Sequence, residues 1–121
     1  MAIVTNTYKT PTLPDFVIRR REILRASALK EAAKALKAVE AAGGQAVVFG
    51  SVLRPGAFSE DSDIDICLIK PSTFSEENVP FYTLVDTAIN GFEADISWYD
   101  DLLPVVRSVI EKEGLSAADV C

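Results

Sequence analysis

The sequence VVFGSVLRPGAFSEDSDIDICLI, which runs from Val47 to Ile69, holds the pattern that decides the fold. An apolar run ends at the pair Gly50-Ser51, a loop follows, and a second apolar run then places Asp63 and Asp65 on either side of one isoleucine. Burying a carboxylate costs free energy unless the group is paired, hydrogen-bonded or bound to a metal ion. Two carboxylates in a segment that otherwise suits burial therefore indicate a site where something offsets that cost.

The two aspartates of this second run are predicted to share one face of a strand. Side chains alternate between the faces of a strand, so Asp63 and Asp65 project the same way, roughly 7 Å apart along it. With no basic residue beside them they repel each other, and Mg²⁺ would relieve the repulsion because it binds carboxylate and phosphate oxygens. The alternative is that Asp63 caps the loop and Asp65 lies on an exposed sheet face.

A third carboxylate occurs in the later segment EADISW, where Asp95 alternates with apolar residues as in a half-buried strand. If this strand neighbours the second one, all three carboxylates converge. Three acidic groups on adjacent strands can hold two metal ions about 3.5–4 Å apart, the geometry of phosphoryl and nucleotidyl transfer. Taken alone, Asp95 is equally well explained as a solvent-facing strand position.

The Gly-Ser pair directly follows the first strand. Glycine at position 50 allows an unusual backbone angle and a close approach of the backbone to a ligand. Ser51 offers a hydroxyl and an amide to a phosphate group, and Arg54 could add a positive charge. A lone Gly-Ser pair usually means a turn, and no Gly-Lys-Ser/Thr follows, so this is not a Walker loop.

The remaining pattern predicts alternating helices and strands. We expect a long helix from Asp15, acting as its N-cap, to about Ala42, with Gly43-Gly44 ending it. The other expected elements are strands over 45–49, 63–69 and 93–98 and helices over 81–90 and 100–113, the last with Leu103, Val106 and Ile110 on one face. This order predicts a small α/β domain with helices packed on a short mixed sheet. Residues 1–14 are expected to form an N-terminal arm and residues 15–121 a single domain.

Composition narrows the possible functions. The 121-residue chain has a net charge of −6, which argues against nucleic-acid binding through the whole surface. Eight of the twelve basic residues lie in residues 1–37, including a stretch from Arg19 to Arg25 that we interpret as a solvated helix face, whereas fifteen of the eighteen acidic residues lie in 38–121.

No histidine is present, which excludes Ser-His-Asp and Cys-His catalysis. The two cysteines form no disulfide framework and Cys67 is expected to be a small buried hydrophobe. With no transmembrane run and no signal-peptide pattern, a cytoplasmic location is the expectation.

The combined motif resembles the polymerase-β-type nucleotidyltransferase superfamily, whose pattern is Gly-Ser, then Asp-x-Asp, then a third Asp on another strand. The matching residues are Gly50-Ser51, Gly56, Ser62 to Asp65 and Asp95. The short length and layout resemble its minimal nucleotidyltransferase (MNT) branch over roughly residues 45–113. Two departures concern the loop: GSVLRPG is one residue longer than the usual G-S-x-x-x-G, with Pro55 inserted, and Val52 replaces the common arginine, which leaves Arg54 as the candidate substitute.

The resemblance implies a reaction and a role for each residue. Such enzymes transfer a nucleoside monophosphate from an NTP, usually ATP, to a hydroxyl and release pyrophosphate. Asp63 and Asp65 would hold two Mg²⁺ ions, Asp95 would bind the second ion and orient or deprotonate the hydroxyl, and Gly50 and Ser51 would bind the β- and γ-phosphates.

The resemblance also implies a partner, because many stand-alone MNT domains are antitoxins of HEPN ribonuclease toxins and some adenylylate the toxin. Two alternatives stay open. One is a small-molecule nucleotidyltransferase of the aminoglycoside-modifying type, and the other is a non-catalytic binding module of the same fold. Neither a membrane nor a nucleic-acid partner is indicated, and a homo-oligomer is compatible with the sequence.

Overall fold

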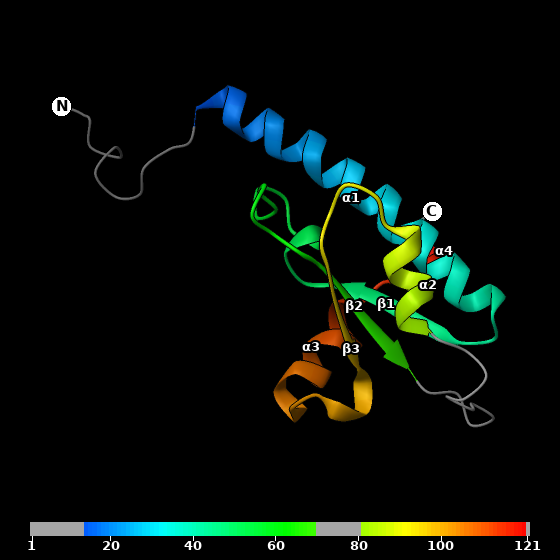
Figure 1. Cartoon of the computed structure of the whole chain (residues 1–121). Helices are drawn as coiled ribbons and strands as arrows, with labels where there is room; N and C mark the ends of the chain where they lie inside the picture. Colours follow the sequence, from blue (N-terminus) through cyan, green and yellow to red (C-terminus); the bar gives the residue numbers. More distant parts are fainter. Residues whose placement is uncertain (1–13, 70–80, 121) are drawn as a thin grey trace.

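The computed structural model describes residues 14–69 and 81–120, and within them it confirms the predicted α/β class (Figure 1). The elements in chain order are α1 (Asp15–Ala41), β1 (Gln45–Phe49), the 3-10 helix η2 (Gly50–Leu53), β2 (Ile64–Ile69), α2 (Phe81–Ala88), β3 (Ala94–Trp98), the 3-10 helix η3 (Tyr99–Asp101), α3 (Pro104–Glu113) and α4 (Ala117–Val120). The predicted arm, apart from Pro14, and the connection over 71–80 lie outside the described residues. None of the helices among the described residues is both long enough and apolar enough to cross a membrane.

Helix α1 is the longest element and has the predicted length, but its cap differs from the prediction. The N-cap position is Pro14, and Asp15 is the first helical residue, without a side-chain capping hydrogen bond. Asp15 is therefore an acidic residue of the first turn, where its negative charge interacts favourably with the positive end of the helix dipole. Its buried residues begin at the middle of the helix and continue through its second half: Ala28, Ala32, Ala35, Leu36 and Val39. The first half extends beyond the sheet in Figure 1.

The sheet has the order β1-β2-β3, with β1 antiparallel to β2 and β2 parallel to β3. The two parallel strands are joined through α2, as parallel pairs require a crossover. The condition under which the carboxylates could converge, that the third strand neighbours the second, is therefore met. Beyond β1, Leu115 forms a single antiparallel bridge with Val48.

Strand alternation divides the sheet into two faces. Ile64, Ile66 and Leu68 of β2 are fully buried in the core with α1 and α2, together with Ala46 and Val48 of β1. The opposite face carries Asp65 and Cys67, and Cys67 is fully buried as expected. Helix α3 approaches this second face, where Ile110 and Gly114 lie beside Val47 (Figure 1).

The connection from η2 to β2 is tied to the core by an aromatic side chain. Phe58 is fully buried and its ring centroid lies 5.9 Å from that of Phe92. Val52, in the middle of η2, is also fully buried. These two anchors give a loop of polar residues a defined position next to the ends of the strands.

The C-terminal region corrects one helix prediction. The residues expected to begin the last helix, Asp100 and Asp101, belong to the short η3 turn, and α3 begins at Pro104. Proline suits the first helical position because its fixed φ matches a helix and its missing N–H would be unpaired there. Leu103 precedes the helix and is 68% exposed rather than part of its buried face, to which Ile110 contributes.

Candidate functional site

The parallel pair β2–β3 brings two of the three predicted carboxylates together. Asp65 of β2 and Asp95 of β3 are direct partners in the strand register. Paired positions of neighbouring strands point to the same side of a sheet, so both side chains lie on the face opposite the α1–α2 core. Asp95 is exposed and Asp65 is half-buried.

The electrostatic surroundings of Asp65 show that the acidic groups influence one another. Partial burial, with the negative charges of Asp95 and then Asp63, raises the pKa of the Asp65 carboxyl from 3.8 to about 6. Desolvation and like charges both disfavour the ionised form of an acid. A cation placed between these groups would reverse both effects.

Asp63 lies immediately before β2, because the strand begins at Ile64 and not at residue 63 as predicted. The backbone N–H of Ile64 donates to the Glu93 carbonyl oxygen at 2.9 Å, which fixes the start of β2 against the start of β3. The Asp63 side chain is exposed, and its charge contributes to the raised pKa of Asp65. The three acidic residues therefore gather at one end of the parallel pair.

The donor set suits a hard divalent cation, which prefers carboxylate oxygens. Within the part of the chain that the structure describes, no three His, Cys, Asp or Glu side chains stand in a metal-binding arrangement. The exposed Asp63 and Asp95 side chains would have to turn toward Asp65, and exposed side chains change rotamer within nanoseconds. The partial burial of Asp65, together with the nearby charges of Asp95 and Asp63, raises the pKa of its carboxyl and thus favours a cation at this position.

Gly50 lies directly against the half-buried carboxylate. Its φ is +84°, a conformation that side-chain-bearing residues rarely adopt, and a Cβ placed on it would lie 2.2 Å from Asp65 Oδ2. Phe49, the residue before it, is the antiparallel register partner of Asp65. The glycine is therefore required both by the backbone angle and by the close approach of the carboxylate.

Ser51 follows in the first turn of η2, where it is partly buried. Its carbonyl oxygen accepts a hydrogen bond from the Arg54 N–H at 3.0 Å, which closes the turn. The Gly50–Ser51 segment thus begins at the end of β1, and its first residue lies beside Asp65.

Arg54, the other predicted phosphate ligand, is engaged elsewhere in the structure. Its Nη2 forms an ion pair with Glu113 Oε1 of α3 at 2.9 Å. Both residues line a groove, whose other lining residues are Arg25, Leu29, Leu53, Leu115, Asp119 and Val120. The structure therefore does not place Arg54 with the carboxylates.

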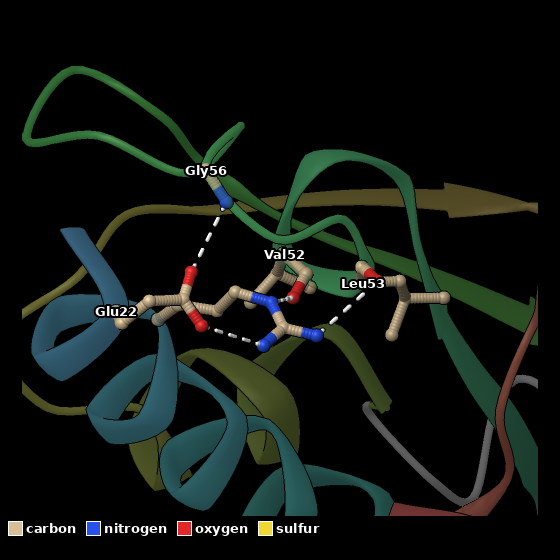
Figure 2. A network of polar contacts seen from close by, with 5 residues as sticks. Glu22, Val52, Leu53 and Gly56 are labelled. Atoms are coloured by element: carbon tan, nitrogen blue, oxygen red, sulfur yellow. Dashed lines mark hydrogen bonds and ion pairs between the residues drawn. The ribbon is translucent and has the colours of Figure 1, made fainter. Parts of the chain in front are cut away.

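Sequence reasoning missed a group of residues on α1 that hold the loop. Figure 2 shows the Glu22 carboxylate bonded directly to the Gly56 N–H. The side chain of Arg25 links the same carboxylate to the carbonyl oxygens of Val52 and Leu53. The expectation that Arg25 belongs to a solvated basic face is wrong, because its side chain is only 21% exposed. The contact spans 27 residues, and helical periodicity carries no signal for so distant a partner.

The comparison with known families gives one match. Residues 29–117, well over half of the chain, match the family model described as "Nucleotidyltransferase domain". No curated protein matches the sequence. The matched range includes the Gly-Ser pair, all three carboxylates and the strands that bear Asp65 and Asp95.

Proposed function

Because the chain belongs to the nucleotidyltransferase domain family, within the polymerase-β-type superfamily, we propose that it is a Mg²⁺-dependent enzyme that transfers AMP from ATP to a hydroxyl of a partner protein. The observation that carries this proposal is the register pairing of Asp65 with Asp95 next to Gly50. This pairing places two carboxylates side by side, with the backbone of Gly50 in close contact with one of them.

Each residue has a distinct role in the proposed reaction. Asp63, Asp65 and Asp95 would hold the divalent cations, which when bound neutralise phosphate charge and make the acceptor hydroxyl more acidic. Asp95 orients this hydroxyl and accepts its proton. Gly50 and Ser51 bind the β- and γ-phosphates through the backbone and the serine hydroxyl. A bond forms between the acceptor oxygen and the α-phosphorus, and the bond to pyrophosphate breaks.

A protein acceptor is favoured by the exposure of the site. Asp63 and Asp95 are exposed, so a side chain of another protein can reach them without a deep cavity. Leu103 and Val105, each 68% exposed, offer apolar surface at the start of α3. By resemblance to the MNT branch, we propose that the acceptor is a HEPN-type toxin and that the chain acts as its antitoxin.

The direct test is label transfer from ATP. The purified protein would be incubated with Mg²⁺, ATP labelled at the α-phosphate, and an all-helical protein of HEPN type encoded by a neighbouring reading frame. Label is expected on the partner, and the Asp63→Ala/Asp65→Ala double variant should abolish it. Asp86→Ala, which removes an exposed carboxylate from α2, is the matched control and should transfer label normally.

The two alternatives predict other outcomes of the same experiment. Label that appears on an aminoglycoside and not on the protein would indicate a small-molecule enzyme. Neutralisation of the partner that persists in the Asp63→Ala/Asp65→Ala variant would indicate a stoichiometric binding module. Either result would overturn the proposed protein adenylylation.

A further inference from the structure

We propose that Glu22 and Arg25 of α1 are positioning residues that set the place of Gly50-Ser51 relative to the carboxylates and thereby the affinity for the triphosphate. The inference rests on the proposed function, since it concerns how the same site binds its nucleotide. Neither residue lies within the stretch that matches the family model, which begins at residue 29.

Arg25 holds the C-terminal end of η2. Its Nε donates to the Val52 carbonyl oxygen at 2.7 Å and its Nη2 to the Leu53 carbonyl oxygen at 3.2 Å. The last carbonyl groups of a helix lack partners within it and carry a partial negative charge, which a cation stabilises. The planar guanidinium presents its donors to the two carbonyl groups in a rigid fork, whereas the ammonium of a lysine is a compact charge on a flexible stem.

Glu22 holds both the arginine and the far side of the loop (Figure 2). Its Oε1 accepts a hydrogen bond from Arg25 Nη1 at 3.3 Å, and its Oε2 accepts one from the Gly56 N–H at 3.0 Å. Arg21 Nη1 donates to the Gly56 carbonyl oxygen at 3.1 Å. One turn of α1 therefore binds the loop at both of its ends, from Val52 to Gly56.

The other end of η2 faces the acidic site. Gly50 begins η2 and lies so close to Asp65 that a Cβ would overlap the carboxylate. The 3-10 helix is thus held between Asp65 on one side and the guanidinium of Arg25 on the other. Because it is only four residues long, a shift at Val52 or Leu53 moves Gly50 and Ser51 as well.

Helix α1 therefore determines the position of the phosphate-binding segment. Its second half is packed into the core through Ala32, Leu36 and Val39. The hydrogen bonds of Glu22 and Arg25 then hold the loop in a fixed position relative to this helix. The positive charge of Arg25 is already shared by Glu22 and two carbonyl groups, so its part is to position the loop and not to bind phosphate itself. Misplacing a binding group by about 1 Å can cost about 100-fold in an enzymatic rate.

The test is the binding of one probe, an ATP analogue with a methylene group between its α- and β-phosphates. Binding is measured by calorimetry in the presence of Mg²⁺, at a temperature well below the melting temperature of each variant. Arg25→Gln is expected to weaken binding by about tenfold or more, and Arg25→Lys by less, because lysine keeps the charge and can bond one carbonyl group. Arg20→Gln is the matched control: it removes a guanidinium of the same helix that pairs with Glu60 at the surface, and it should bind as wild type does.

A purely structural role would lower the melting temperatures in the same order but leave the dissociation constants unchanged, and that result would overturn the inference. Should Arg25→Gln not fold, Glu22→Gln, which keeps the side-chain shape, provides the decision: weaker binding supports the inference and wild-type binding overturns it. A different result would refute the proposed function. If wild-type protein does not bind the analogue, or binds it independently of Mg²⁺ and of Asp63 and Asp65, both the proposed function and this inference are wrong.

Discussion

The contact between Gly50 and Asp65 is the residue-scale feature on which the site depends. The glycine has a φ of +84°, and its missing side chain leaves room for the carboxylate. The sequence indicated that a glycine was needed after the first strand, since the motif requires close backbone approach. It could not show that the neighbour in question is Asp65, because that follows from the register in which Phe49 faces Asp65.

Replacing Gly50 by alanine should therefore cost more stability than replacing a glycine of equal φ in open space. Gly91 also has a φ of +84°, and a Cβ there would meet no atom within 4 Å, so Gly91→Ala reports backbone strain alone, about 1–2 kcal/mol. Gly50→Ala should lower the free energy of unfolding further, as it must also displace Asp65. Urea unfolding of both variants makes the comparison, and equal losses would contradict the close contact.

The raised pKa of Asp65 predicts how metal-free stability depends on pH. Since its pKa is about 6 in the folded protein and 3.8 ordinarily, the folded state binds more protons between these values, and the free energy of unfolding falls as pH rises through that window. In chelator-treated protein, Asp65→Asn should remove this loss and be more stable than wild type above about pH 7, with little difference below about pH 4. Thermal unfolding at both pH values provides the test, and a variant without a pH-dependent gain would refute it.

At the scale of elements, α1 has two parts with different tasks. Its second half packs on the sheet, and its first half holds the loop through Glu22 and Arg25. In the sequence, Leu29, Ala32, Leu36 and Val39 recur at steps of three, four and three, which predicts one packed helical face. Of these, Leu29 is partly buried and the other three are fully buried. The loop contacts stayed hidden, since they join side chains to backbone carbonyl groups far along the chain.

A pair of α1 variants separates the buried face from the exposed one. Leu36 is fully buried, so Leu36→Ala should destabilise the fold by about 2–5 kcal/mol through lost burial and a cavity. Ile23 is 71% exposed, and Ile23→Ala should change stability by less than about 0.5 kcal/mol. Chemical denaturation measures both. A large loss in Ile23→Ala would show that the first half of the helix packs against something, such as a second copy of the chain.

The strands and the short helices differ in how well their ends could be predicted. Apolar runs and alternation located all three strands to within one residue, because burial on the α1–α2 face requires that pattern. The last helix begins later than predicted. Asp100 and Asp101 suit the start of a helix, but α3 begins at Pro104. Asp63 lies inside the predicted strand but outside β2, because the alternating pattern extends one residue before Ile64, where β2 begins.

At the scale of the whole molecule, the distribution of negative charge supports a cation-binding site. The acidic residues concentrate after residue 37, and three of them gather at the start of β2 and β3. Among the described residues, large apolar side chains are exposed on the first turns of α1, such as Phe16, and at the start of α3, such as Leu103. An exposed acidic site and exposed apolar surface are the features that support the proposed protein acceptor.

The central claim is that Asp63, Asp65 and Asp95 jointly bind divalent cations with a nucleotide. Crystals grown with Mn²⁺ and the α,β-methylene ATP analogue would test it through the anomalous signal of manganese. The expected map has a manganese peak shared by the three carboxylates, with the β- and γ-phosphates at Gly50-Ser51. A bound nucleotide with no manganese at these carboxylates, or with Asp95 turned away from the ion, would contradict it.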